Sequence, residues 1–245
     1  MTCAQLFRPT ASCLFVALLM SGCARPPERP TPAAQKPSVS ALPEACKMPL
    51  IRENEQLLRF DTTASHLHIL AYRGGRLARF GHNHLINAKS MEGYVRIAPS
   101  PEKSEFTLCL PVAALEVDNP QLRAQAGEQF ATPLDASAIA GTRHNMLSPQ
   151  LLDADRYPFI VVQGAIIARS ADSTLLPLTL TLRGQQKNLS YPSRIVVQAR
   201  QVSATGELTL RQSDLGLEPF SALFGALLVQ DELTIRYTLV AKEAL

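Results

Sequence analysis

The sequence lacks features that mark several common protein classes. It has no tryptophan, only 18% charged residues, and a formal charge of +3 over 245 residues. Four of the 24 basic residues and two of the 21 acidic residues precede Cys46, so the rest of the chain is close to neutral. Such a chain lacks the positive surface of a nucleic-acid-binding protein, and we expect no nucleic-acid partner. With 46% apolar residues it is also too hydrophobic for a disordered protein.

Familiar catalytic motifs are missing as well. The sequence contains no Gly-x-Ser-x-Gly, no phosphate-binding loop, no His-Glu-x-x-His and no Cys-x-x-Cys. Neighbouring acids such as Asp153 and Asp155 are typical of solvated caps rather than of catalytic pairs. The sequence therefore predicts a binding protein and not an enzyme.

The N-terminal residues have the layout of a bacterial export signal. Arg8 precedes an apolar run, Cys13–Met20, that is too short to span a bilayer. The junction Leu19–Cys23 resembles a lipobox, in which cleavage before the cysteine leaves Cys23 to carry diacylglycerol and an acyl chain such as palmitate. We therefore expect a lipoprotein signal peptide at 1–22 and attachment to a membrane through acyl chains. A plain signal peptide without lipid is the alternative.

A proline-rich tether is expected at 23–45. Six prolines lie between Ala24 and Pro43, a composition that favours polyproline II and cannot bury a core. In lipoproteins of this type, a residue other than Asp after the lipidated cysteine directs the protein to the outer membrane. Ala24 therefore implies the periplasmic face of the outer membrane of a Gram-negative bacterium.

The remaining residues, 46–245, are expected to form one mainly β domain. In Asp231–Val240, the apolar residues Leu233, Ile235, Tyr237 and Leu239 alternate with other residues, which is the period of a half-buried strand. Similar runs predict eight further strands, at Ser65–Tyr72, Leu77–Ala88, Gly93–Ala98, Glu105–Leu110, Phe159–Ala168, Leu175–Arg183, Arg194–Ala199 and Gly206–Arg211. About nine strands indicate an antiparallel barrel or sandwich.

Short helices are expected between about residues 118 and 158, where the alternation stops. Asn119-Pro120 and Ser148-Pro149 each place a capping side chain before a proline, and Asp135 could cap a helix over Ala136–Met146.

Two cysteines, Cys46 and Cys109, remain in the expected mature domain. Export would permit a disulfide between them, and two free thiols are the alternative, because pairing depends on a Cα separation that the sequence does not give.

Several segments resemble the YceI-like family. In chain order these are DTTASHLHILAY at Asp61–Tyr72, MEGYVRI at Met91–Ile97, the segment Met146–Phe159 with its Tyr-Pro, LTLTLRG at Leu178–Gly184, and LTLRQSDLGLEPF at Leu208–Phe220 followed by the last strand. The resemblance implies an extended, lipocalin-like antiparallel barrel that holds a polyisoprenoid-type lipid. We accordingly expect an apolar lipid inside the barrel, for sequestration or transport.

The histidines raise a second hypothesis. If Gly74-Gly75 is a two-residue hairpin turn, Ile69 faces Phe80 and Leu67 faces His82. Residues Leu67, Ile69, Phe80, His82 and His84 then share the inward face and are the candidate ligand contacts, whereas His66 and His68 point outward.

Under this register, His82 and His84 could hold a metal or haem iron. A longer loop or a bulge would change the parity and bring all four histidines to one side. A metal- or haem-binding module and a scaffold that contacts envelope partners therefore stand beside lipid binding as alternatives.

Overall fold

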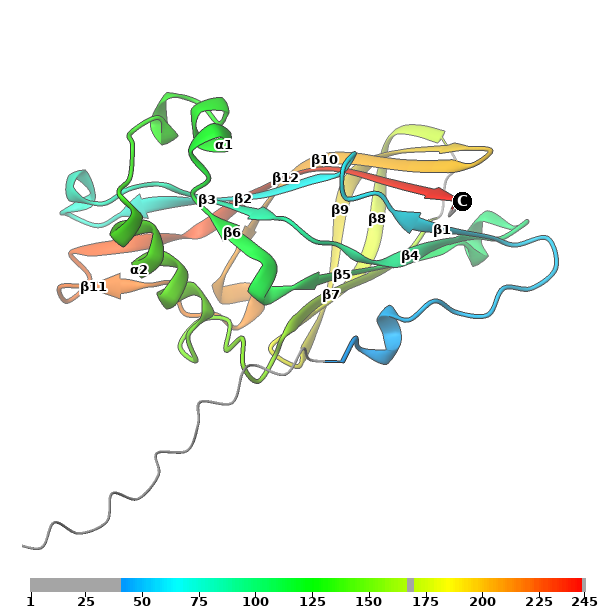
Figure 1. Ribbon diagram of the computed structural model, residues 1–245, viewed down its shortest axis with the longest axis horizontal. Coiled ribbons are helices and arrows are strands. Elements are labelled where there is room, and N and C mark those ends of the chain that lie inside the picture. Colours follow the sequence, from blue (N-terminus) through cyan, green and yellow to red (C-terminus); the bar gives the residue numbers. More distant parts are fainter. Residues whose placement is uncertain (1–40, 167–169, 244–245) are drawn as a thin grey trace, which may run out of the picture. The chain divides into compact units, whose positions relative to one another are not determined.

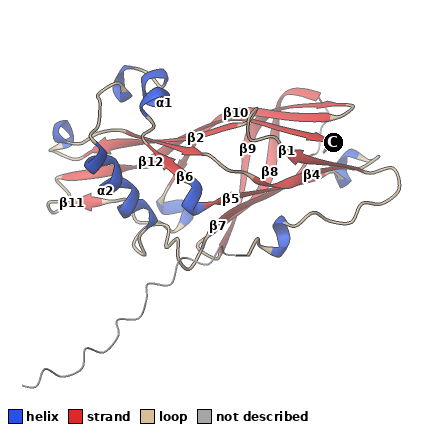
Figure 2. Cartoon of the chain, in the orientation of Figure 1, coloured by secondary structure: helices blue, strands red, loops and turns tan. Residues whose placement is uncertain are grey.

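The structure is a computed structural model that describes residues 41–166 and 170–243, all within one compact unit. The signal peptide and Cys23 lie outside the described residues. Most of the described chain is antiparallel β-sheet (Figure 2). The strands are β1 (Gln56–Phe60), β2 (His66–Gly74), β3 (His84–Ala88), β4 (Glu92–Ile97), β5 (Glu105–Pro111), β6 (Leu115–Val117), β7 (Phe159–Ala165), β8 (Ser170–Leu182), β9 (Gln185–Gln198), β10 (Gln201–Arg211), β11 (Ser221–Ala222) and β12 (Leu227–Glu243).

Eight of these strands close into an antiparallel barrel, as the sequence predicted. The order β1-β4-β5-β7-β8-β9-β10-β12 returns to its start because the end of β12 also pairs with β1, with Phe60 opposite Ala241. The strands expected at 65–72, 93–98, 105–110 and 159–168 are confirmed within a few residues as β2, β4, β5 and β7. Those expected at 175–183, 194–199, 206–211 and 231–240 are confirmed as parts of β8, β9, β10 and β12, which all begin earlier than predicted. Strands β1, β6 and β11 were not predicted, because each is too short to show a period.

A corner between β1 and β2 lets both strands run along β12. The Ser65 hydroxyl donates to the Val240 carbonyl and accepts from the Val240 amide, and the Asp61 amide also donates to that carbonyl. The Asp61 carboxylate accepts hydrogen bonds from Thr63 and from the Ala64 amide, which fixes the turn. Asp61 and Ser65, in the first of the segments that resemble the family, therefore fix the turn of the chain between the two strands.

Strands β2, β3 and β6 extend the sheet beyond the ring, where helices cover it. β2 pairs with β12, β3 with β2, and β6 with β3. Helices α1 (Pro120–Gln125) and α2 (Ala136–Leu147) follow, and α2 lies beside β6 (Figure 1). The Asn119 and Asp135 side chains accept the predicted capping hydrogen bonds, whereas no helix begins at Ser148-Pro149.

The barrel wall is incomplete between β9 and β10. These strands pair only over 194–198 and 201–205, so the first half of β9 and the second half of β10 separate. Pro192, which has no amide hydrogen, is tolerated in β9 because β10 is not paired with β9 at this position. The chain after β10 packs into this part of the wall, with Leu215 and Leu217 buried and Gly216 close to Gln185.

The predicted strand Leu77–Ala88 and the two-residue turn at Gly74-Gly75 are wrong. Only 84–88 is a strand, and Ala78–Phe80 forms a 3-10 turn. The Leu77 amide donates to the Ala226 carbonyl. The loop after β2 is therefore hydrogen-bonded to the neighbouring β11–β12 hairpin and does not lengthen the pairing between β2 and β3. Ile69 pairs with Ile86 rather than Phe80, and this even offset keeps His84 on the predicted face.

Candidate ligand-binding cavity

The inward faces of the strands are apolar and enclose a cavity of about 360 Å³. The alternation predicted for the last strand holds, because Leu233, Ile235, Tyr237 and Leu239 all line this cavity. Its volume lies within the range of about 300 to 1,000 Å³ that is typical of ligand sites. The interior of the barrel is therefore hollow and hydrophobic.

The interior differs between two regions. The closed end holds a packed apolar cluster; its buried members are Leu58, Val95, Ile97, Ile166, Leu176, Ile195, Val202 and Ala241, and all but Leu58 and Ile97 also border the cavity. In the hollow region many inward side chains stay partly exposed; they include Ile69, Val162, Leu178, Leu189, Leu208 and Ile235. Inward side chains keep exposed surface only where they face open space, so the cavity lies in the hollow region with the closed end as its floor.

Helix α2 and the turn after it cover one side of the hollow region. Met146, Leu151 and Leu152 add apolar surface to the cavity, and Thr142 and Asn145 of α2 add two polar groups. The few polar groups of the lining thus include two on the helix that lies beside β6.

A buried ionic cluster positions His84 in the cavity wall. The His84 Nδ1 atom lies 2.6 Å from a carboxylate oxygen of Asp118, which is fully buried. The other Asp118 oxygen accepts from the Leu85 amide at 2.9 Å and from Arg123 at 2.6 Å. Arg123 also donates to the carbonyls of Asn83 and Thr132. Four segments of the chain are therefore tied together behind one histidine.

This cluster keeps Asp118 ionised. Burial alone would raise the pKa of Asp118, but hydrogen bonds from His84, the Leu85 amide and Arg123, together with the electrostatic interaction with His84, outweigh burial and lower it. An ionised carboxylate only accepts hydrogen bonds, so His84 Nδ1 must donate. Nε2 is then left to interact with a ligand, since no described residue bonds to it.

The structure brings together three of the five predicted ligand contacts. Leu67, Ile69 and His84 line the cavity, whereas Phe80 and His82 do not. Both lie in the loop that follows the hydrogen bond from Leu77 to Ala226, which carries them away from the barrel wall. Phe80 is 63% exposed.

His82 lies near the start of α2 instead. There it makes a small electrostatic contribution to the lowered pKa of Asp135, which is due mainly to hydrogen bonds from the Ala138 amide and the Ser137 side chain. His66 and His68 alternate with the inward Leu67, so they point outward as predicted. Across residues 41–166 and 170–243, no group of three or more His, Cys, Asp or Glu side chains is placed to hold a metal ion.

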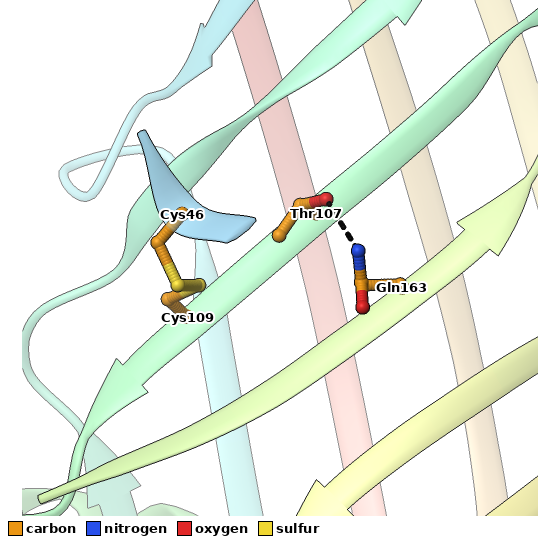
Figure 3. Close-up of a disulfide and its surroundings, with 4 residues drawn as sticks. All are labelled: Cys46, Thr107, Cys109 and Gln163. Carbon is orange, nitrogen blue, oxygen red and sulfur yellow. Dashed lines mark hydrogen bonds between the residues drawn. A yellow bond between two sulfur atoms is a disulfide. The ribbon is translucent and has the colours of Figure 1, made fainter. Parts of the chain in front are cut away.

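A disulfide fastens the N-terminal side of the domain to the barrel wall. Cys46 and Cys109 are bonded, with 63 residues of sequence separation, and lie against the outer side of β5 because Leu108 and Leu110 face the cavity (Figure 3). Next to it, Gln163 of β7 donates to Thr107 at 3.4 Å. Leu42 packs against the apolar cluster formed by Cys46, Cys109 and Val161. Contacts with the barrel therefore extend into the segment 23–45 that was expected to be a tether. A loop of this length stabilises the fold by about 4 kcal/mol.

Sequence reasoning missed the partners of His84. Asp118 and Arg123 are separated from it by more than thirty residues, and no local pattern links them. The sequence offered one signal, because Asp118 stands directly before the Asn119-Pro120 cap. The structure adds that Asp118 follows the end of a strand and has a positive φ of 54°. That backbone conformation is unusual for a residue other than glycine and marks a position held by its surroundings.

No helix among the described residues has the length and apolar character needed to cross a membrane. Comparison with curated protein sequences finds no significant match.

The sequence model of the family described as YceI-like domain matches residues 58–241 of this chain. Two solved structures have the same fold over most of their length.

The first is Burkholderia cenocepacia BcnA, with 14% identity over 75% of this chain and 99% of the other, and a TM-score of 0.54. The second is a polyisoprenoid binding domain from Saccharophagus degradans implicated in plant cell wall breakdown. It has 12% identity over 76% of this chain and 98% of the other, with a TM-score of 0.51.

Proposed function

The chain belongs to the YceI-like family, and from this premise we propose that its barrel binds a long apolar lipid of the polyisoprenoid type for sequestration or transport. The observation that carries the proposal is the hollow region, whose inward side chains are almost all apolar and in many cases remain partly exposed. An apolar chain would cover that surface and gain about 25 cal/mol for each Å² removed from water. The related domain described as polyisoprenoid binding shares this fold.

The polar groups of the lining would set the orientation of the lipid. His84 Nε2 can hydrogen-bond to a hydroxyl group, which both donates and accepts, and Asn145 can donate to a carbonyl or a phosphate oxygen. The Thr142 hydroxyl donates to the Ala138 carbonyl and can accept a hydrogen bond from the ligand. We place the polar end of the ligand beside α2 and its apolar tail along the strands toward the closed end. The residues act by burial and orientation, and no bond of the ligand is broken.

We further propose that the barrel acts at the periplasmic face of the outer membrane of a Gram-negative bacterium. Acyl chains on Cys23 would hold it there, and the segment 23–45 would give it reach. A barrel attached in this way could take up lipid that leaves the membrane, and the loaded barrel would remain at the membrane.

Lipid copurification tests the proposal. The full chain is expressed in a Gram-negative host, purified, and analysed by lipid mass spectrometry, and an apolar lipid should be recovered in a fixed ratio to protein. Intact mass of the mature N-terminus reports lipidation of Cys23 separately.

Two neighbouring substitutions on β10 provide a matched control. Leu208→Trp places an indole in the cavity, whereas Thr209→Trp places it on the exposed outer face of the same strand. We expect Leu208→Trp to lose most of the bound lipid and Thr209→Trp to keep it. Equal lipid content in both variants, or no lipid in the parent protein, would refute binding in the cavity.

A further inference from the structure

The turn between β11 and β12 exposes two large apolar side chains. Leu223 is 63% exposed and Phe224 is completely exposed. Both lie at one end of the barrel, where β12 begins (left in Figure 1). Apolar side chains in this setting contribute nothing to the core of the barrel.

The same two residues have an unfavourable backbone conformation. Leu223 and Phe224 have positive φ angles of 51° and 56°, in a turn where Gly, Asn or Asp is strongly preferred. Bulky residues in this region cost free energy, and being exposed they recover none of it by packing. Because these side chains strain the backbone and add no packing, we look for their role in binding something other than the rest of the chain.

A second loop adds aromatic and basic groups at the same end. The loop 75–82 bonds to the turn through the Leu77 amide and the Ala226 carbonyl, at 2.7 Å. It carries Phe80, which is 63% exposed, with the Arg79 guanidinium 4.7 Å from the centre of its ring. We call residues 75–82 and 222–226 together the tip.

The charged side chains of the tip itself are all basic. The sequence from Arg73 to Met91 contains Arg73, Arg76, Arg79 and Lys89 and no acidic residue, and 219–230 contains no charge at all; the acid Asp135 lies near His82. Arg73 donates to the Gly81 carbonyl at 2.8 Å, and none of the three arginines forms an ion pair with a described carboxylate. The tip therefore combines exposed Leu and Phe with guanidinium groups that lack a described carboxylate partner.

We propose that the tip inserts into the surface of a phospholipid bilayer that carries anionic headgroups. Leu223, Phe224 and Phe80 would enter the boundary between headgroups and acyl chains, and the arginines would bind phosphate at the level of the headgroups. A bilayer fits better than a protein partner because the side chains project from turns, whereas a protein interface needs a broad complementary surface.

The position of the tip gives insertion a purpose that rests on the proposed lipid-binding function. Phe220 and Val229 flank the β11–β12 hairpin and line the cavity. The apolar lining therefore continues from the hollow region to the strands that carry the tip. Docking by the tip would let a lipid pass between bilayer and cavity with little exposure to water.

The absence of tryptophan allows a local test in the full chain. Phe224→Trp creates a single fluorophore at the tip, and Leu175→Trp creates one on β8 at a leucine with the same 63% exposure as Leu223. Any anchor at the N-terminus holds both variants equally. With vesicles of phosphatidylethanolamine and phosphatidylglycerol, we expect emission of Trp at 224 to move to shorter wavelength and to be quenched by brominated acyl chains. Trp at 175 should do neither.

Two substitutions separate insertion from folding. In the Phe224→Trp background, Leu223→Asn puts a residue that tolerates positive φ into the turn, so the fold should be at least as stable while quenching falls. Arg76→Gln with Arg79→Gln should lower quenching by vesicles containing phosphatidylglycerol toward the level seen with phosphatidylcholine alone, because about fivefold in affinity is lost per arginine at an anionic surface.

Each other outcome overturns the proposal. Equal quenching at 224 and 175, or none at either, would exclude insertion by the tip. A blue shift at 224 that appears without vesicles as protein concentration rises would assign the surface to a second copy of the chain. Lipid mass spectrometry on the same samples keeps the two ideas apart, because an unquenched tip on a lipid-loaded barrel refutes docking alone.

Discussion

The closed end and the hollow region of the barrel are built from similar side chains and differ in how those side chains are used. Leu58 at the closed end is 1% exposed, packs within the buried cluster there and does not line the cavity. Ile235 in the hollow region points inward as well, yet it remains partly exposed because it faces the cavity. Apolar burial thus stabilises one region fully and the other only in part.

The wall of the hollow region compensates with other interactions. The cluster of His84, Asp118 and Arg123 ties β3 to α1, and the disulfide from Cys46 holds the outer face of β5. A ligand cavity needs a surface that stays open without collapse, and polar bonds behind the wall can supply rigidity that interior packing cannot. The comparison leads to four predictions.

Removal of Asp118 should have the largest effect. Asp118→Ala leaves Arg123 buried without its anionic partner, and loss of one member of a buried ion pair costs about 3 to 5 kcal/mol of unfolding free energy. Urea denaturation measures the change. Glu116→Ala, on the adjoining strand β6 and partly exposed, should cost less than about 1 kcal/mol. Similar losses for the two variants would mean that the cluster does not stabilise the wall.

Leu58→Ala should follow, at the closed end. Truncation of a fully buried leucine removes its transfer free energy and leaves a void, for a loss of about 2 to 5 kcal/mol. The same denaturation measurement gives this loss, and bound lipid per protein should stay unchanged because the hollow region is intact. A lower lipid ratio with unchanged stability would reverse the roles assigned to the two regions.

The cluster of His84, Asp118 and Arg123 should also make the unfolding free energy depend on pH, with a smaller effect than the substitutions above. The pKa of Asp118 is lower in the folded protein than in the unfolded chain, so the folded state binds fewer protons. Its contribution is complete above the unfolded pKa and is lost as the pH falls through the folded pKa. Unfolding curves between pH 7 and acid should therefore show a decline that is reduced in Asp118→Asn. An identical decline in the variant would assign it to other carboxylates.

Ile235→Ala should have the smallest effect on stability. Its side chain already faces open space, so truncation enlarges an existing cavity and costs about 1 kcal/mol. Lipid binding should weaken instead, because the ligand loses an apolar contact. If Ile235→Ala destabilises the protein as much as Leu58→Ala, the hollow region is packed and the contrast between the regions is wrong.

Much of the fold could be predicted because the information is local. The period of two in the last strand, the caps at Asn119 and Asp135, and the order of the family segments all act through neighbouring residues. The loop after Gly74 could not be predicted, because its conformation depends on a hydrogen bond to Ala226, far away in the chain.

The candidate site was predictable only in part. Alternation assigns Leu67 and Ile69 to the inner face, but the same pattern fits a filled barrel and a hollow one, since periodicity gives direction and not volume. His84 was placed on the correct face through a wrong turn whose offset happened to be even. Asp118, which holds His84, was invisible because the two residues meet only through tertiary structure.

The disulfide also determines how the barrel would respond to a pull on its N-terminal side. Tension that arrives at Cys46 passes through the sulfur bridge to Cys109 and so enters the middle of β5. The stretch between the two cysteines, which contains β1 to β4, is bypassed, so the tension does not run along its backbone. Strand β5 is hydrogen-bonded along both edges, to β4 and β7, so the force is shared in shear over many backbone bonds instead of peeling the barrel open from β1.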